Sequence, residues 1–69
     1  MKVFEIILCV DGNYRCYEIT GKWNKGGIYS SPKDAYFSSL KILENEFGEY
    51  GKDFILLIPP SVFKSDFLD

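Results

Sequence analysis

The stretch from Ser31 to Gly48 constrains the fold most, because it has the pattern of a helix with both ends marked. Ser31 suits the N-cap, and Pro32 suits the first turn, where its missing N–H would have no helical partner. Asp34 can complete a capping-box-like arrangement, and Gly48 is typical of the position after a helix. At about 100° per residue, one stripe carries Tyr36, Leu40, Leu43 and Phe47. We therefore predict one helix that lays one face on a sheet.

Two segments before this helix are typical of a β-hairpin. Val3 to Val10 and Tyr14 to Thr20 are the expected strands, and Asp11-Gly12-Asn13 joins them with residues that tolerate positive φ. Either Asp11-Gly12 or Gly12-Asn13 can form the turn, and both registers give the same faces because they differ by two residues. One face then carries Phe4, Ile6, Leu8, Val10, Tyr17 and Ile19. The other carries Val3, Glu5, Ile7, Cys9, Tyr14, Cys16 and Glu18.

A last strand is expected from Asp53 to Ile58, without polar alternation and ended by two prolines. We predict that it lies beside the first strand and antiparallel to it, in the order second, first, third. The fold class is then α+β, a small antiparallel sheet with one helix on one face. The element order is ββαβ, or βββαβ if Ile28 to Ser30 adds a short strand. Residues 1–60 form this single domain, and residues 61–69 form a tail with the spacing of a short helix.

Length and composition argue against several classes of protein. The chain has 69 residues and is 46% apolar, which is too short for two domains and too apolar for a disordered chain. Its longest apolar run, Phe54 to Ile58, is far below the ~20 residues that span a bilayer. The pattern of a secretory signal is also missing from the first residues. We therefore expect a cytoplasmic protein with no membrane contact.

The chain has few side chains that are suited to catalysis or to metal binding. The chain has no histidine and two cysteines, Cys9 and Cys16, so a nucleophile lacks its commonest base and a metal lacks nitrogen and sulfur ligands. We expect both cysteines to be reduced structural thiols, with a cross-strand disulfide as the alternative. The prediction is a non-enzymatic protein with no catalytic residue, no cofactor and no metal.

The predicted strands carry more apolar side chains than one helix can cover, because a helix packs on only one face of a sheet. The uncovered face should carry Val3, Ile7, Cys9 and Tyr14, with either Ile55 and Leu57 or Phe54, Leu56 and Ile58. Soluble monomers seldom expose contiguous apolar patches above a few hundred Å². One candidate cover is the tail, through Val62, Phe63, Phe67 and Leu68. The other is a different protein or a second copy, docked on the face or at an edge strand.

The candidate partner-binding residues are aromatic or basic: Lys22, Trp23, Lys25, Tyr29, Tyr14, Phe63 and Phe67. Aromatic anchors dominate many protein interfaces, which favours a protein-binding module. Aromatic residues between cations also suit stacking on nucleic acid. The alternative is therefore a single-stranded nucleic-acid-binding protein that uses the loop of Lys22, Trp23 and Lys25. The net charge of −2 makes this alternative the weaker one, because binding to phosphates depends on positive charge.

The order of the elements resembles that of known small proteins. A hairpin, the segment Tyr29-Ser30-Ser31-Pro32-Lys33-Asp34-Ala35 that opens a helix, and a terminal strand follow one another. Over residues 3–58 this pattern resembles small ββαβ proteins, among them a short bacteriophage inhibitor of host RNA polymerase and antitoxin domains partly like RNase H. The resemblance implies an inhibitor or modulator of phage or mobile-element type that occludes a host protein, such as nucleic-acid-processing or defence machinery. It transfers no functional residue.

Overall fold

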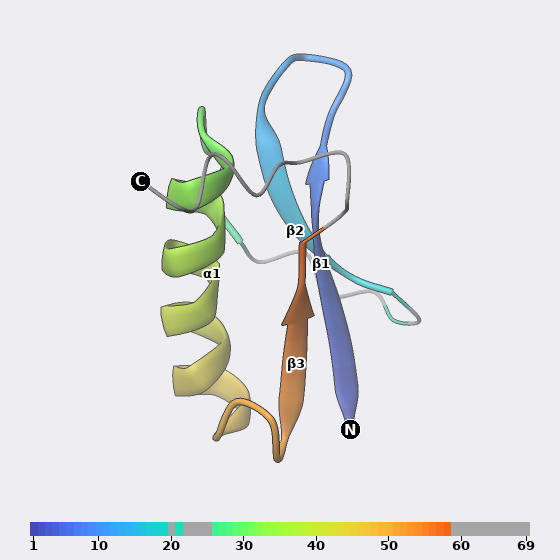
Figure 1. The fold of residues 1–69 in the computed structure, drawn as a ribbon, viewed down its shortest axis with the longest axis vertical. Helices are drawn as coiled ribbons and strands as arrows, with labels where there is room; N and C mark the ends of the chain where they lie inside the picture. The colour runs from blue at the N-terminus through green and yellow to red at the C-terminus, as the bar shows by residue number, and fades with distance from the viewer. Residues whose placement is uncertain (20, 22–25, 59–69) are drawn as a thin grey trace.

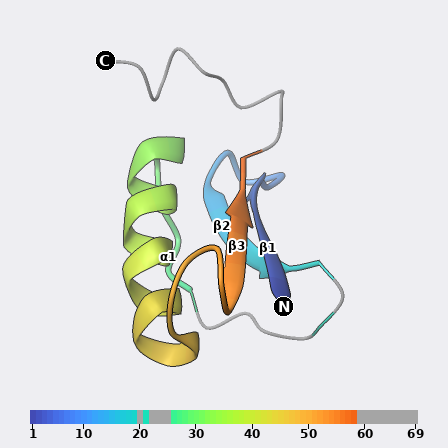
Figure 2. The same ribbon diagram turned by 60° about the horizontal axis from the view of Figure 1, so that its bottom comes forward.

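The computed structural model describes residues 1–19, 21 and 26–58. Within them the chain forms β1 (Lys2–Leu8), β2 (Tyr14–Glu18), α1 (Pro32–Phe47) and β3 (Phe54–Leu57). These strands form one sheet in the order β2-β1-β3, and α1 lies along one face of it (Figures 1 and 2). The predicted α+β class and strand order are therefore confirmed. No helix in this described part of the chain is long and apolar enough to cross a membrane.

The sheet is mixed, so the prediction that β3 runs antiparallel to β1 is wrong. β3 pairs with β1 in parallel, and both arrows point the same way in Figure 1. The reason is an extra reversal between β2 and α1, where Tyr29 pairs antiparallel with Tyr14 through backbone hydrogen bonds of 2.7 and 3.0 Å. Because of this reversal α1 runs antiparallel to β1, and β3 must return parallel to it. The expected short strand at 28–30 is reduced to this single bridge.

The hairpin loop has three residues instead of two, which exchanges the faces of β2. The Cys9 N–H donates to the Asn13 carbonyl at 2.8 Å, and the Gly12 N–H donates to the Cys9 carbonyl at 2.9 Å. Gly12 has a φ of 82°, as the last residue of such a loop requires. Ile6 consequently faces Cys16, one residue out of step with the predicted Asp11-Gly12 register and three residues out of step with the Gly12-Asn13 register. Both shifts are odd, so each side chain of β2 changes face. The helix side receives Tyr14, Cys16 and Glu18, and the other side receives Arg15, Tyr17 and Ile19.

The core lies between α1 and the sheet. Its buried apolar members are Phe4, Ile6, Cys16, Ala35, Leu43, Phe54 and Leu56. The Phe4 ring centroid lies 5.4 Å from that of Phe47 and 6.2 Å from that of Phe54. The centre of the helical stripe is formed by the fully buried Ala35, Ser39 and Leu43, while the predicted Tyr36, Leu40 and Phe47 are half-buried on its flank. Two small side chains at this centre allow α1 to approach the sheet closely.

Both predicted ends of the helix are confirmed. The Ser31 Oγ accepts a hydrogen bond from the Asp34 N–H at 3.1 Å, and Pro32 occupies the first turn. Gly48 ends the helix with a φ of 120°, and a Cβ there would collide with the Asp53 carboxylate. That carboxylate accepts the Glu49 N–H at 2.7 Å and holds the loop into β3. Local side chains thus determine where α1 begins and ends.

Candidate interaction surface

The sheet face turned away from α1 carries no other described helix or strand (Figure 2). We call it the open face, and its side chains are Val3, Glu5, Ile7, Arg15, Tyr17, Ile19, Ile55 and Leu57. Of the two sets considered for β3, the odd-numbered one lies here, because Phe54 and Leu56 are buried in the core. Tyr14 does not belong to this face, contrary to prediction, because the register of β2 turns it toward the helix.

The strand registers arrange the open face in rows. One row runs across the sheet as Ile19, Val3 and Ile55, and the next as Tyr17, Glu5 and Leu57. Ile19 is 52% exposed and Leu57 is 39% exposed, at opposite margins of the face. A fully apolar row therefore lies directly beside a row with one carboxylate at its centre.

Glu5 is the charged residue at the middle of the open face. It is half-buried between Tyr17 on β2 and Leu57 on β3, with Val3 and Ile7 on the same side of its own strand. It forms no ion pair with any residue that the structure describes. Its carboxylate is therefore available to a cation that approaches this face.

Arg15, at one corner of the open face, is already engaged. Its Nη2 donates to Asp11 Oδ2 at 2.6 Å, across the hairpin loop. A hydrogen bond with Tyr17 and the charge of Asp11 both raise the pKa of Arg15. The pKa of Asp11 is lowered, first because its carboxylate accepts the Asn13 N–H and further by Arg15. The cation of this face thus has a partner, whereas Glu5 has none among the described residues.

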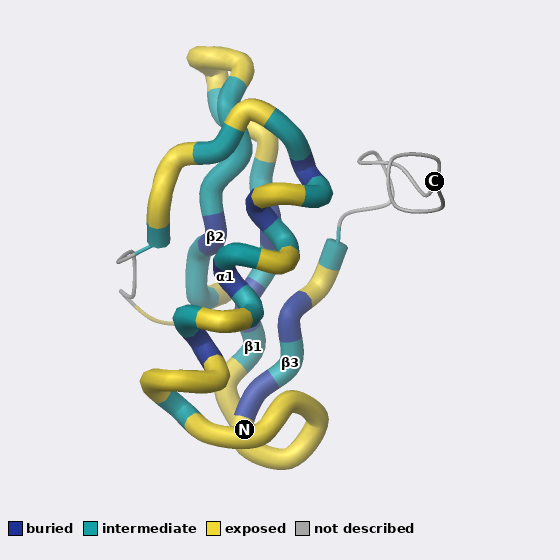
Figure 3. The backbone as a smooth tube through the Cα atoms, turned by 90° about the vertical axis from the view of Figure 1, so that its left-hand side faces the viewer, coloured by how far each residue is buried: buried dark blue, intermediate teal, exposed yellow. Residues whose placement is uncertain are grey.

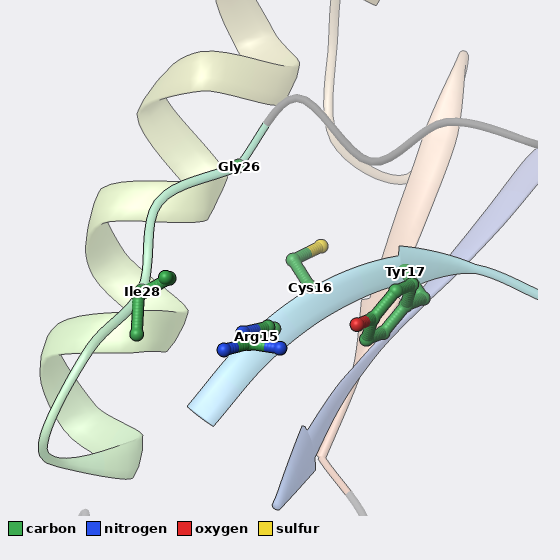
Figure 4. A pocket seen from close by; sticks show the side chains of 5 residues that line it. All are labelled: Arg15, Cys16, Tyr17, Gly26 and Ile28. Carbon is green, nitrogen blue, oxygen red and sulfur yellow. The ribbon is translucent and has the colours of Figure 1, made fainter. Parts of the chain in front are cut away.

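A pocket of about 250 Å³ opens beside β2. Arg15, Cys16, Tyr17, Gly26 and Ile28 line it (Figure 4). It is smaller than the ~300–1,000 Å³ typical of ligand pockets. Burial raises the pKa of the Cys16 thiol to about 11, so this nucleophile stays protonated at neutral pH. The pocket consequently offers no activated nucleophile.

The two cysteines are both free thiols. Cys16 is buried on the helix side opposite Ile6, whereas Cys9 stands opposite Asn13 beyond the end of β1. The register that would have placed the two cysteines opposite each other is not the one adopted. Among the described residues, no group of three His, Cys, Asp or Glu side chains could hold a metal ion.

Two of the predicted partner-binding residues are described, Tyr14 and Tyr29. They form the bridge before α1 and pack against the core, so part of each ring has a structural role. The others lie outside the described residues: Lys22, Trp23, Lys25, Phe63 and Phe67. The nucleic-acid-binding loop and the covering tail at 61–69 therefore stay predictions.

Sequence reasoning missed the importance of Glu5 and assigned Tyr17 and Ile19 to the wrong face. A three-residue loop that ends in glycine was the signal that could have placed them.

In comparisons with known proteins, no family model, no curated protein and no solved structure matches this chain. The described site offers apolar area, one carboxylate without an ion pair and open backbone edges, which are means of binding another protein.

Proposed function

We propose that this chain is a non-enzymatic protein-binding module whose open face receives a protein partner. The observation that supports this proposal is the apolar row of Ile19, Val3 and Ile55 beside the carboxylate of Glu5. Covering such a row removes apolar surface from water, which stabilises a complex by roughly 25 cal/mol per Å². The side chains of this surface stand on paired strands and not on loops, so the backbone of the sheet holds them in position.

The chemistry of Glu5 specifies what the partner must carry. A partner that covers the face buries this carboxylate, and a buried carboxylate without a counter-ion is costly. Arg15, the cation of the same face, is paired with Asp11 at 2.6 Å and does not pair with Glu5 in this structure. The partner must therefore present a lysine or arginine opposite Glu5, surrounded by apolar side chains. Such a charge excludes competitors that lack it.

This mode of binding agrees with the role of an inhibitor or modulator. A partner held on the open face has part of its own surface occluded, and that requires no chemistry from this chain. A few well-packed anchors supply most of the affinity in such interfaces, so a chain of 69 residues is large enough.

Affinity capture from extracts of the source cell tests the proposal with three forms of the chain. These are the wild type, Glu5→Lys on the open face and Glu44→Lys on an exposed part of α1 as the matched control. We expect a protein that the wild type and the control retain, and that Glu5→Lys binds at least about tenfold more weakly, or about 1.4 kcal/mol. Reversing the charge of the opposing partner residue should restore binding to Glu5→Lys.

Three results would contradict the proposal. One is the absence of any captured protein, and another is equal capture by all three forms. The third is binding that Glu5→Lys weakens but that no charge-reversed partner residue restores. In that case the carboxylate does not face a cation in the complex.

A further inference from the structure

β3 ends on the open face, directly beside Glu5. Its last residue, Leu57, pairs with Glu5 of β1 and is 39% exposed at the margin of the face. Figure 3 shows this exposed end of β3 after buried and half-buried residues. Pro59 and Pro60 follow Ile58, and proline has no N–H to donate to β1. The pairing of β3 with β1 therefore stops at the row that contains Glu5.

Glu5 needs a cation that the described residues do not supply. The other charged side chain of the open face is Arg15, which is paired with Asp11. The chain has three further lysines outside the described residues: Lys22, Lys25 and Lys64. The first two belong to the loop after β2, and the third belongs to the tail, residues 61–69. A counter-ion for Glu5 from this chain must therefore come from the loop or from the tail.

The start of the loop lies on the wrong side of the sheet. A Cβ at Gly21 would collide with the carboxylate of Glu18. Glu18 belongs to the helix side of β2, so the residue that leads into the loop lies on that side. The tail, in contrast, follows a strand whose last residue is a direct neighbour of Glu5. Position along the chain thus favours Lys64 as the counter-ion.

The tail also has the apolar residues that the open face requires. At about 100° per residue, the short helix that its spacing predicts has one stripe in which a lysine lies among apolar side chains, namely Phe63, Lys64, Phe67 and Leu68. Asp66 and Asp69 fall outside this stripe. The stripe therefore complements a face that has one carboxylate among apolar side chains.

We infer that the tail of the same chain covers the open face in the free protein, with Lys64 opposite Glu5. Seven residues lead from Leu57 to Lys64 and can span up to about 25 Å. Neighbouring strands lie only about 5 Å apart, so the tail reaches every strand of the face. The phenylalanines of the tail then cover the apolar row beside Glu5, and Lys64 offsets the cost of burying the carboxylate.

The tail consequently competes with a protein partner, because both present a cation among apolar side chains. Only Ile58 and two prolines separate it from β3, so its effective concentration at the face is about millimolar. A partner must displace it, and the apparent affinity falls with the fraction of chains whose face is uncovered. This competition rests on the proposed function, whereas the contact between the tail and the open face does not.

NMR on the purified full chain tests the contact. Nuclear Overhauser effects should connect the ring protons of Phe63 or Phe67 with the methyl groups of Val3 or Ile55. They should persist on dilution, with the 8.0 kDa mass of a single chain in sedimentation equilibrium. These two results together place the tail on the face of its own chain.

Charge exchange tests the pairing of Lys64 with Glu5. Lys64→Glu and Glu5→Lys should each remove the Overhauser effects, because each brings two like charges together. The double variant that carries both changes should restore them. Lys25→Glu is the matched control in the loop and should leave them unchanged. If a variant does not fold, as judged by circular dichroism, the contacts of the wild type still decide the question.

Absence of these contacts in the wild type would overturn the inference. So would contacts that disappear on dilution, which would come from a second copy, or contacts that Lys25→Glu removes and Lys64→Glu does not. A protein captured from cell extracts should bind Lys64→Glu at least about threefold more tightly than the wild type. Tail contacts in a chain that captures no protein would support this inference and contradict the proposed function. A captured protein without tail contacts would do the reverse.

Discussion

Replacing Ser39 by alanine should stabilise this protein, although the change removes a group from its interior. Ser39 is fully buried at the centre of the helix stripe, and its Oγ has no hydrogen-bond partner among the residues that the structure describes. The thiol of Cys16 is the neighbouring polar group; burial raises the pKa of this thiol, and its interaction with Ser39 acts in the opposite direction. The contact does not reach hydrogen-bond geometry at Ser39, so the hydroxyl remains unsatisfied.

Three contributions determine the size of the effect. A buried hydroxyl without a partner costs about 1–3 kcal/mol, and alanine is favoured over serine inside a helix by about 0.5 kcal/mol. The space left by the oxygen, roughly 15 Å³, costs about 0.4 kcal/mol. The net gain is therefore about 1–3 kcal/mol. That is large beside the ~3–5 kcal/mol that a core of this size supplies.

Thermal and denaturant unfolding of three proteins would measure this gain. They are the wild type, Ser39→Ala and Ser38→Ala, where Ser38 is half-buried on the same helix and serves as the matched control. The control should gain only the helix preference, about 0.5 kcal/mol. Ser39→Ala should exceed it and raise the melting temperature by roughly 4–8 °C for each kcal/mol. The pKa of the Cys16 thiol should also rise further, because the contact with Ser39 lowers it.

A result in which Ser39→Ala is no more stable than Ser38→Ala would refute this reasoning. It would mean that the Ser39 hydroxyl has a partner in solution, such as the carbonyl of Ala35 one turn earlier in α1. An unchanged thiol pKa in Ser39→Ala would separately contradict the contact between Ser39 and Cys16.

Two further predictions concern the hairpin and its buried thiol. Gly12→Ala should lose about 1–2 kcal/mol in denaturant unfolding, because φ is 82° there even though no atom lies within 4 Å of the new Cβ. Gly12→Asn should lose less, and equal losses would contradict the role of backbone strain. Burial raises the pKa of Cys16 from 9.0 to about 11, so the unfolded chain ionises first. Stability due to this thiol is complete below pH 9.0 and is lost as pH rises through about 11. Cys16→Ala should not lose stability in this way as the pH rises. The prediction is contradicted if the free energies of unfolding of the wild type and of Cys16→Ala fall in parallel.

The strand faces illustrate the limit of prediction for this chain. Both faces of β2 are about equally apolar, with Tyr14 and Cys16 on one and Tyr17 and Ile19 on the other. Hydrophobic alternation therefore could not select the register, and Gly12 suits a two-residue turn as well as the last position of the three-residue loop that forms. Packing beneath the helix selects it, since the small thiol of Cys16 fits beside Ser39 where α1 approaches the sheet. This choice places Tyr17 beside Glu5 on the open face.

The sequence by itself determined the helix, both of its ends and the surplus of apolar strand residues over what one helix covers. These features depend on neighbouring residues, such as Ser31 with Asp34, and are therefore visible locally. Only the tertiary structure decided the direction of β3 and the composition of the open face. Both depend on pairings between distant residues, Tyr14 with Tyr29 and Ile6 with Cys16, whose energies arise only when the chain has closed on itself.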